Sequence, residues 1–354
     1  MATNFQNFLE SIGEKVDDFE EETFLLFSQE IPSQNLGFID SKSSTVDVTI
    51  HGHDISIKQS PSVLTSTRAG GTTGAVLWKI TPLIATWLTS KALNPLWASS
   101  ILTPTSTVVE LGCGISGLIP ICLAPLVGHY IATDQEYVQR LVGENLAANE
   151  GVEVGAGAGV KTQGGKKGQQ HGSKSRQGRK SAAAGQDRNS SSRGRKPTTN
   201  NPSSSGSGGG SGSGSSNITF IPLDWEHDDP STLQSLIPKK SSPPPTQEES
   251  NRETDEEATG FPLLLACDCI YNTTLIPPLI RTIADLSRLR PPYQPTSTPN
   301  SSLPPTVSIV AQQLRSPDVF ERWLREAMGC FYVWRVRDEV LIEGLREGRG
   351  TEGI

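Results

Sequence analysis

Cysteine is scarce in this sequence and carries no metal pattern. Five cysteines are scattered over 354 residues, and none belongs to a C-x-x-C pair. Structural zinc sites need such pairs or cysteines with closely spaced histidines, so a site of that kind is excluded. Cys267 and Cys269 alternate along an expected strand, which favours small buried hydrophobes over a redox or metal pair. The five histidines, among them His51 and His53 in an expected hairpin turn, add no ligand pattern, and we expect no metal.

Long apolar runs are also missing. The most apolar segment, 118–133, is interrupted by Pro120, Pro125 and His129, whereas a membrane-spanning helix needs about 20 apolar residues. The N-terminus lacks the basic-then-apolar pattern of a secretory leader. We therefore expect a soluble protein without a membrane partner, in the reducing setting of the cytoplasm, with the nucleus as the alternative. We also expect a monomer.

Apolar residues make up only 34% of the chain, against about 45–50% in typical globular domains. The deficit is local, in 151–216, 238–260 and 291–306. Segments this poor in apolar side chains cannot bury enough surface to fold. We therefore predict an accessory helix and β-hairpin over 1–60, then one α/β domain over 61–354, interrupted by disordered insertions at 152–216 and 238–260.

Negative charge dominates once the first insertion is set aside. Residues 151–216 carry eleven lysines and arginines against two acids, a net +9, so the net −7 of the chain leaves −16 on the remainder. An acidic body suits a basic protein partner. The basic segment offers a contact for nucleic acid, although a solubilising tether is the favoured interpretation.

The most informative segment is a buried strand that ends in a glycine turn. Thr107–Val109 carry the strand signal, and Gly112, Gly114 and Gly117 satisfy G-x-G-x-x-G. A second strand, 130–133, ends at Asp134, where nucleoside-binding α/β folds hydrogen-bond ribose hydroxyls. The pattern predicts a nucleoside across the carboxyl ends of parallel strands.

Glu110 discriminates between possible nucleosides. The glycine pattern alone is compatible with a dinucleotide such as NAD, but a pyrophosphate sits badly beside a carboxylate two residues before the first glycine. S-adenosylmethionine carries a sulfonium and an ammonium and no phosphate, so Glu110 favours this methyl donor. Capping of a neighbouring helix by Glu110 ranks third.

Other elements follow from apolar periodicity. A helix is expected after Gly70–Gly74, and Trp78 lies off its apolar stripe, as a candidate ligand wall or a surface-packing residue. Further expected elements are a helix from Glu136, strands at 218–221, 261–267 and 306–312, helices at 275–289 and 317–328, and a closing antiparallel pair at 331–336 and 339–342.

Four motifs in this order resemble a known family. They are Glu110–Gly114, Asp134, Leu223-Asp224-Trp225 and Asp268–Tyr271. Together they resemble the seven-strand (class I) protein lysine methyltransferases marked by D-x-x-Y. The sequences of Ala266–Asn272 and Leu275–Pro278 are most similar to those of the fungal ribosomal lysine N-methyltransferase 5 group. The resemblance covers roughly 45–150 and 217–345. It implies a Rossmann-like seven-strand sheet with helices on both faces, S-adenosylmethionine as cofactor, and a large-subunit ribosomal protein as substrate.

The resemblance also implies site residues. Asp268 would align the substrate amine or help its proton leave, with capping of the following helix as the alternative, and Tyr271 would form a channel wall or simply pack. Trp225 would stack on adenine and Asp224 would accept from its amino group. The implied cofactor set is completed by Trp78, Glu110, Gly112, Cys113, Gly114, Asp134, Ala266 and Cys267.

Three other functions compete with this one. An NAD-dependent oxidoreductase is disfavoured by Glu110 and by the lack of a second catalytic motif. A non-catalytic interaction protein is disfavoured by the intact glycine turn and acids. A methyltransferase for small molecules or nucleic acid remains, but the Asn/Asp-Pro-Pro-Tyr/Phe motif of nucleic-acid amino methyltransferases is absent, because Cys269-Ile270-Tyr271 follows Asp268.

Overall fold

The computed structural model describes residues 4–29, 37–67, 71–92, 94–152, 217–237, 260–292, 303–343 and 345. The chain divides into two units, residues 1–157 with 216–354, and residues 158–215. The second unit lies outside the described residues, as does almost all of both expected insertions, so the predicted domain division and the predicted disorder stay predictions. The first unit contains every strand and helix of the described residues.

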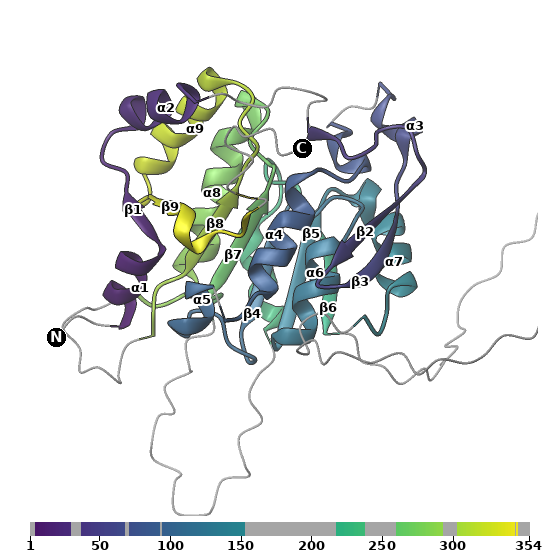
Figure 1. The fold of residues 1–354 in the computed structure, drawn as a ribbon, viewed down its shortest axis with the longest axis horizontal. Coiled ribbons are helices and arrows are strands. Elements are labelled where there is room, and N and C mark those ends of the chain that lie inside the picture. Colours follow the sequence, from purple (N-terminus) through teal and green to yellow (C-terminus); the bar gives the residue numbers. More distant parts are fainter. Residues whose placement is uncertain are drawn as a thin grey trace, which may run out of the picture. The chain divides into compact units, whose positions relative to one another are not determined.

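Five parallel strands form its central sheet, in the order β6-β5-β4-β7-β8 (Figure 1). They are β4 (Thr107–Leu111), β5 (His129–Asp134), β6 (Ile218–Pro222), β7 (Leu263–Cys267) and β8 (Val307–Ala311). Strand β4 is buried along its whole length, as expected for a parallel strand covered on both faces. The strand order runs outward from β4 in both directions, which creates a crevice at the carboxyl ends where open α/β sheets bind ligands.

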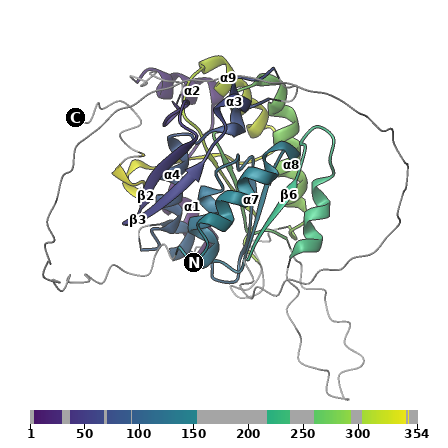
Figure 2. The same cartoon turned by 90° about the vertical axis from the view of Figure 1, so that its right-hand side faces the viewer.

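Helices cover both faces of the sheet (Figure 2). Val108 packs with helices α4 (Ile80–Thr89), α6 (Leu118–Leu123) and α7 (Gln139–Ala148). Its neighbour Val109 packs on the opposite face with α8 (Ile276–Arg288), against which α9 (Pro317–Met328) lies. The α/β Rossmann-like class predicted from sequence is confirmed. No helix of the described residues is long and apolar enough to cross a membrane.

The predicted hairpin is confirmed. Strands β2 (Thr45–Ile50) and β3 (His53–Lys58) pair antiparallel around His51 and Gly52, both at positive φ. The hairpin is fixed to α7 because Asn145 accepts from the backbone N–H of Lys58 at 2.9 Å and donates to its carbonyl at 2.9 Å. Two short helices, α3 (Pro61–Leu64) and α5 (Pro95–Ala98), and 3₁₀ turns complete the connections: Thr73–Ala75, Ala124–Leu126, Glu136–Val138, Pro230–Leu236, Thr273–Leu275 and Asp338–Val340.

The predicted closing strand pair is wrong. Residues 338–340 form a 3₁₀ turn, and β9 (Trp334–Val336) instead pairs antiparallel with β1 (Gly13–Lys15), which lies between α1 (Asn4–Ile12) and α2 (Phe19–Phe27). Arg335 of β9 pairs with Glu14 at 2.7 Å and with Glu22 at 3.3 Å, which adds side-chain contacts to the backbone pairing of β9 with β1. Among the described residues the central sheet therefore has five strands rather than seven.

Candidate functional site

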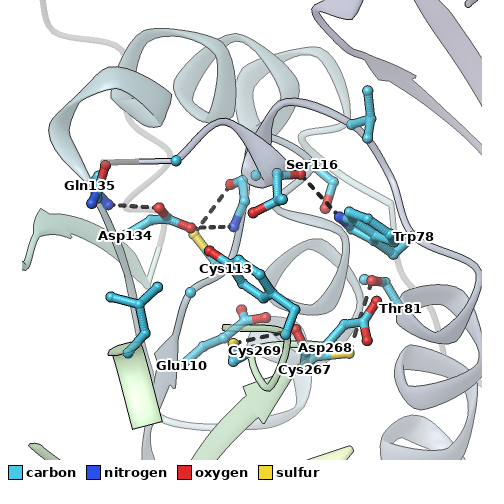
Figure 3. A pocket seen from close by; sticks show the side chains of 18 of the residues that line it. Trp78, Thr81, Glu110, Cys113, Ser116, Asp134, Gln135, Cys267, Asp268 and Cys269 are labelled. Carbon is cyan, nitrogen blue, oxygen red and sulfur yellow. Dashed lines mark hydrogen bonds between the residues drawn. The ribbon is translucent and has the colours of Figure 1, made fainter. Parts of the chain in front are cut away.

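A cavity of about 870 Å³, its open mouth included, lies over the carboxyl ends of β4, β5 and β7 (Figure 3). Eleven of the twelve residues predicted from sequence line it: Trp78, Glu110, Gly112, Cys113, Gly114, Asp134, Asp224, Trp225, Cys267, Asp268 and Tyr271. The twelfth, Ala266, is absent from the lining. It is 2% exposed and packs on the α8 side of the sheet, because alternate residues of a strand face opposite ways.

The glycine turn is held tightly from two sides. Gly112 and Gly114 have φ of +75° and +62°, a region that side chains with a Cβ rarely adopt. The backbone N–H of Gly112 donates to the Thr133 carbonyl at 2.9 Å, and that of Ile115 donates to the Gly74 carbonyl at 2.8 Å. The turn is thus clamped between β5 and the 71–75 loop, with its backbone exposed to the cavity.

Asp134 organises this turn. Its Oδ2 accepts from the backbone N–H of Gly114 at 2.8 Å, and its Oδ1 accepts from the backbone N–H of Gln135 at 2.7 Å. Burial raises the pKa of Asp134 to about 6, although both hydrogen bonds oppose the rise. Each carboxylate oxygen has a second lone pair for a ligand hydroxyl. The predicted contact with ribose stays a prediction.

Glu110 is 2% exposed and accepts a hydrogen bond from the buried Tyr130 hydroxyl at 2.8 Å. Its partner is therefore a side chain of the neighbouring strand and not a helix terminus. Burial raises the pKa of Glu110 to about 8, the Tyr130 hydrogen bond lowers it, and nearby Asp134 raises it further. A nearby cation would stabilise the ionised form of this buried carboxyl, so the site favours a positively charged ligand.

The charge of the lining has one sign. The described residues that line the cavity include four carboxylates, those of Glu110, Asp134, Asp224 and Asp268, and neither lysine nor arginine. A pyrophosphate would meet no basic side chain in this lining. A ligand that carries positive charge would meet complementary charge, so the cavity distinguishes a sulfonium or an amine from a dinucleotide.

Two tryptophans form walls. The Trp225 ring lies 3.3 Å from the position that a Cβ on Gly112 would take, and its buried Nε1 donor has no acceptor among the described residues. A bound acceptor would remove the cost of that unsatisfied donor. Trp78 is fixed by donation to the Thr73 carbonyl at 3.1 Å and by packing on Phe38, with ring centroids 4.5 Å apart. Trp78 is thus a preformed part of the cavity.

Asp224, beside Trp225, is engaged within its own loop. Its Oδ1 accepts from the backbone N–H of Glu226 at 2.9 Å, and its Oδ2 lies 3.3 Å from Nδ1 of His227. These contacts fix the carboxylate at the cavity wall. Contact with an adenine amino group stays a prediction.

Asp268 follows β7 in the left-handed region, with φ of +58°. The alternative that it caps the following helix is wrong, because Asn272 caps that turn by accepting from the backbone N–H of Thr274 at 3.0 Å. Asp268 instead accepts hydrogen bonds from Gln312 and Arg315. Tyr271 lines the same cavity and is 40% exposed, and burial raises its pKa.

Sequence reasoning missed several lining residues and the partners of Asp268. Gly74 was expected only to precede a helix, although the glycine-rich segment Gly70–Gly74 indicates a place where another part of the backbone can approach closely. Gln312 and Arg315 lie where the expected strand 306–312 ends, at the same sheet edge as Asp268, and that position was the available signal. Further lining residues that were missed are Thr73, Thr81, Ser116, Gln135, Tyr137 and Cys269.

Comparison with known proteins agrees with this geometry. Residues 58–161 match the family model for lysine methyltransferases, a segment that includes the glycine turn and Asp134. The family resemblance expected from the motifs is confirmed for this segment. The chain is 30% identical to a ribosomal lysine N-methyltransferase 5 of Candida glabrata over 166 residues, 33% of this chain and 47% of the relative. It is 35% identical to the protein of the same name from Zygosaccharomyces rouxii over 111 residues, 27% of this chain and 34% of the relative.

A third relative carries a different name. The chain is 40% identical over 140 residues to a diaminohydroxyphosphoribosylamino-pyrimidine deaminase of Schizosaccharomyces pombe, 39% of this chain and 33% of the relative. The H-x-E and P-C-x-x-C signature of zinc deaminases does not occur in the present sequence. The chain spans between a third and a half of the length of these relatives.

Proposed function

We propose that this protein is an S-adenosylmethionine-dependent protein-lysine N-methyltransferase. The observation that carries the proposal is the cavity itself: a glycine turn and four carboxylates, with no basic side chain in the described lining, in a segment that matches the lysine methyltransferase family. An NAD-dependent oxidoreductase is disfavoured by the same charges.

The residues present fit the cofactor. Its sulfonium and ammonium suit the acidic lining, and the backbone of Gly112 and Gly114 faces the cavity without a side chain. The orphaned Nε1 donor of Trp225 offers a hydrogen bond to an acceptor on the ligand. When bound, S-adenosylmethionine supplies an activated methyl group whose transfer needs positioning more than acid–base work.

The protein's own residues hold the second substrate. Asp268 and Tyr271 both line the cavity and are proposed to orient the lysine amine. The aromatic face of Tyr271 attracts an ammonium or methylated amine. The amine must also lose its proton, since a free lysine has a pKa of about 10.4.

The proposed substrate is a basic protein, a ribosomal protein of the large subunit in the first instance. The net charge of −16 outside 151–216 supports a basic partner, and the names of two relatives support a ribosomal one. The cytoplasm is the proposed location.

Two measurements test the proposal. The first is incubation of the protein with radiolabelled methyl donor and separated fractions of fungal cells, where label is expected on lysine of a ribosomal protein. The second is calorimetric titration with S-adenosylmethionine and with NAD. Saturable binding of NAD with no response to the methyl donor would overturn the assignment. Label on nucleic acid alone would move the function to the nucleic-acid methyltransferases.

A further inference from the structure

The carboxylate of Asp268 is paired with other side chains of the protein. Arg315 donates from Nη1 to Oδ1 at 2.7 Å and from Nη2 to Oδ2 at 2.6 Å, a two-pronged pair. Gln312 adds a hydrogen bond to Oδ1 at 2.8 Å, and its own Oε1 accepts from the backbone N–H of Ile270 at 2.7 Å. The Asp268 side chain is only 2% exposed, against 22% for Arg315. Such forked charge pairs fix geometry as well as charge.

Arg315 is itself held in place. Its guanidinium lies 5.0 Å from the centre of the Trp78 ring, a cation–π distance, and its Nη1 also donates to the Gln313 carbonyl at 3.3 Å. Arg315 lies outside the lining of the main cavity but lines, with Tyr271, a smaller depression beside it. Arg315 therefore contacts Asp268 from outside the main cavity.

This pairing bears on the proton of the substrate amine. A lysine side chain must be neutral to attack the methyl group, yet an unpaired carboxylate beside it would favour the charged ammonium form. The acidic lining adds to that problem. A guanidinium on Asp268 cancels the nearest negative charge, and Oδ2, which accepts from Nη2 of Arg315, keeps a second lone pair to accept a hydrogen bond from the amine.

We propose that Arg315 is a positioning residue for methyl transfer: it fixes the orientation of the Asp268 carboxylate and neutralises its charge, so that the substrate lysine is bound without being kept charged. The inference rests on the proposed lysine methyltransferase function. Other ionisable groups that face the same space come from β4, β5, β7 and the segments that follow β4, β5, β6 and β7. They are Glu110, Cys113, Asp134, Tyr137, Asp224, Cys267, Cys269 and Tyr271.

The test is the pH profile of turnover with saturating cofactor in wild type, Arg315→Gln and Arg322→Gln. Arg322 is a matched control, since it lies on α9 and pairs with Glu326 at the surface. Loss of Arg315 leaves a net negative charge beside the amine, so the rising limb of the profile should move up by about one to three pH units. At neutral pH turnover then falls about tenfold for each pH unit by which the limb moves, while KM for the protein substrate stays level or drops. Arg322→Gln should keep the wild-type profile.

Asp268→Asn tests the same balance with the opposite sign, and asparagine tolerates the left-handed conformation well. In this variant the positive charge of Arg315 is no longer balanced, so the rising limb of the pH profile of the residual turnover should move to lower pH. This shift tests the inference even if Arg315→Gln fails to fold. A merely structural Arg315 predicts lower turnover without movement of the profile in either variant, which would overturn the inference. Wild type that transfers no methyl group to any protein would instead overturn the proposed function, and the inference with it.

Discussion

A single methyl group on Gly112 tests the geometry of the glycine turn. Gly112 has φ of +75°, and a Cβ added there would lie 2.7 Å from Sγ of Cys269 and 3.3 Å from the Trp225 ring. Cys269 cannot swing away freely, because it is 6% exposed and its Sγ donates to the Leu111 carbonyl at 3.2 Å. The change Gly112→Ala therefore meets both backbone strain and a steric clash.

The two costs can be separated. The left-handed conformation costs an alanine about 1–2 kcal/mol, and overpacking of a tight site costs about 1–3 kcal/mol. Gly112→Ala should thus lower the free energy of unfolding by about 2–5 kcal/mol, a large part of the total stability of a typical domain. In a Cys269→Ala background the clash with sulfur is gone, and the backbone strain and the 3.3 Å approach to the Trp225 ring remain, so the penalty should shrink to about 1–2 kcal/mol.

Urea unfolding of the four proteins of this double-mutant cycle measures the coupling. Gly143→Ala is the matched control, because Gly143 lies in α7 and a Cβ there meets nothing within 4 Å. It should stabilise the protein by about 0.5–1 kcal/mol. The added methyl group at position 112 should also weaken binding of S-adenosylmethionine. An additive cycle, or a Gly112→Ala protein as stable as wild type, would refute the described packing of the turn.

Other residues of the cavity, and the long insertion, give three more predictions. The pKa of Glu110 is raised to about 8, so the binding of a cationic cofactor releases a proton from Glu110. The cofactor affinity measured by calorimetry should therefore fall by up to about tenfold for each pH unit below 8. The variant Glu110→Gln should show a weaker dependence of affinity on pH. In the protein without ligand, the pKa of Glu110 is higher in the folded state than in the unfolded state, so its contribution to stability is full at low pH and is lost as the pH rises toward 8. Glu110→Gln should therefore unfold at a higher temperature than wild type at pH 8.5. The opposite order of unfolding temperatures would contradict the burial of the acid. Asp268→Asn should cut turnover heavily with less change in cofactor affinity, Tyr271→Phe should be milder, and near-normal turnover of Asp268→Asn would remove that residue from the mechanism. Replacement of residues 155–214 by a short linker should leave thermal stability and cofactor affinity nearly unchanged, and a large loss of either would show that the segment is structural.

The cofactor side of the cavity was predictable from sequence because its signals are local. Gly112 and Gly114 indicate a tight turn, and Asp134 follows its strand directly, so parallel topology alone brings them together at one edge. Trp78 and Trp225 needed the family resemblance, since nothing in their own surroundings says which loop reaches the cavity. Ala266 was expected at the cofactor together with its neighbour Cys267, although adjacent residues of a strand face opposite ways and only Cys267 lines the cavity.

The remaining features depend on contacts between distant segments. The pairing of β1 with β9 joins residues over 300 positions apart, and no local pattern favours it over a hairpin next to β9. The role of Asp268 was open for the same reason: its partners Gln312 and Arg315 are 44 and 47 positions away. Apolar periodicity predicts which face is buried, but it does not predict which polar side chains meet at the sheet edge.

The two ends of the cavity handle negative charge differently, and the difference matches the two reactants of a methyl transfer. At the glycine turn, the hydrogen bonds to Glu110 and Asp134 within the described part of the chain come from a tyrosine hydroxyl and from backbone N–H groups, so their charge develops fully when a permanent cation arrives. A sulfonium has no proton to lose and gains from that charge. At the other end, Asp268 is matched by a guanidinium, which suits a lysine that must arrive charged, bind and then become neutral. One acidic cavity can thus hold a fixed cation tightly and still release the proton of its neighbour.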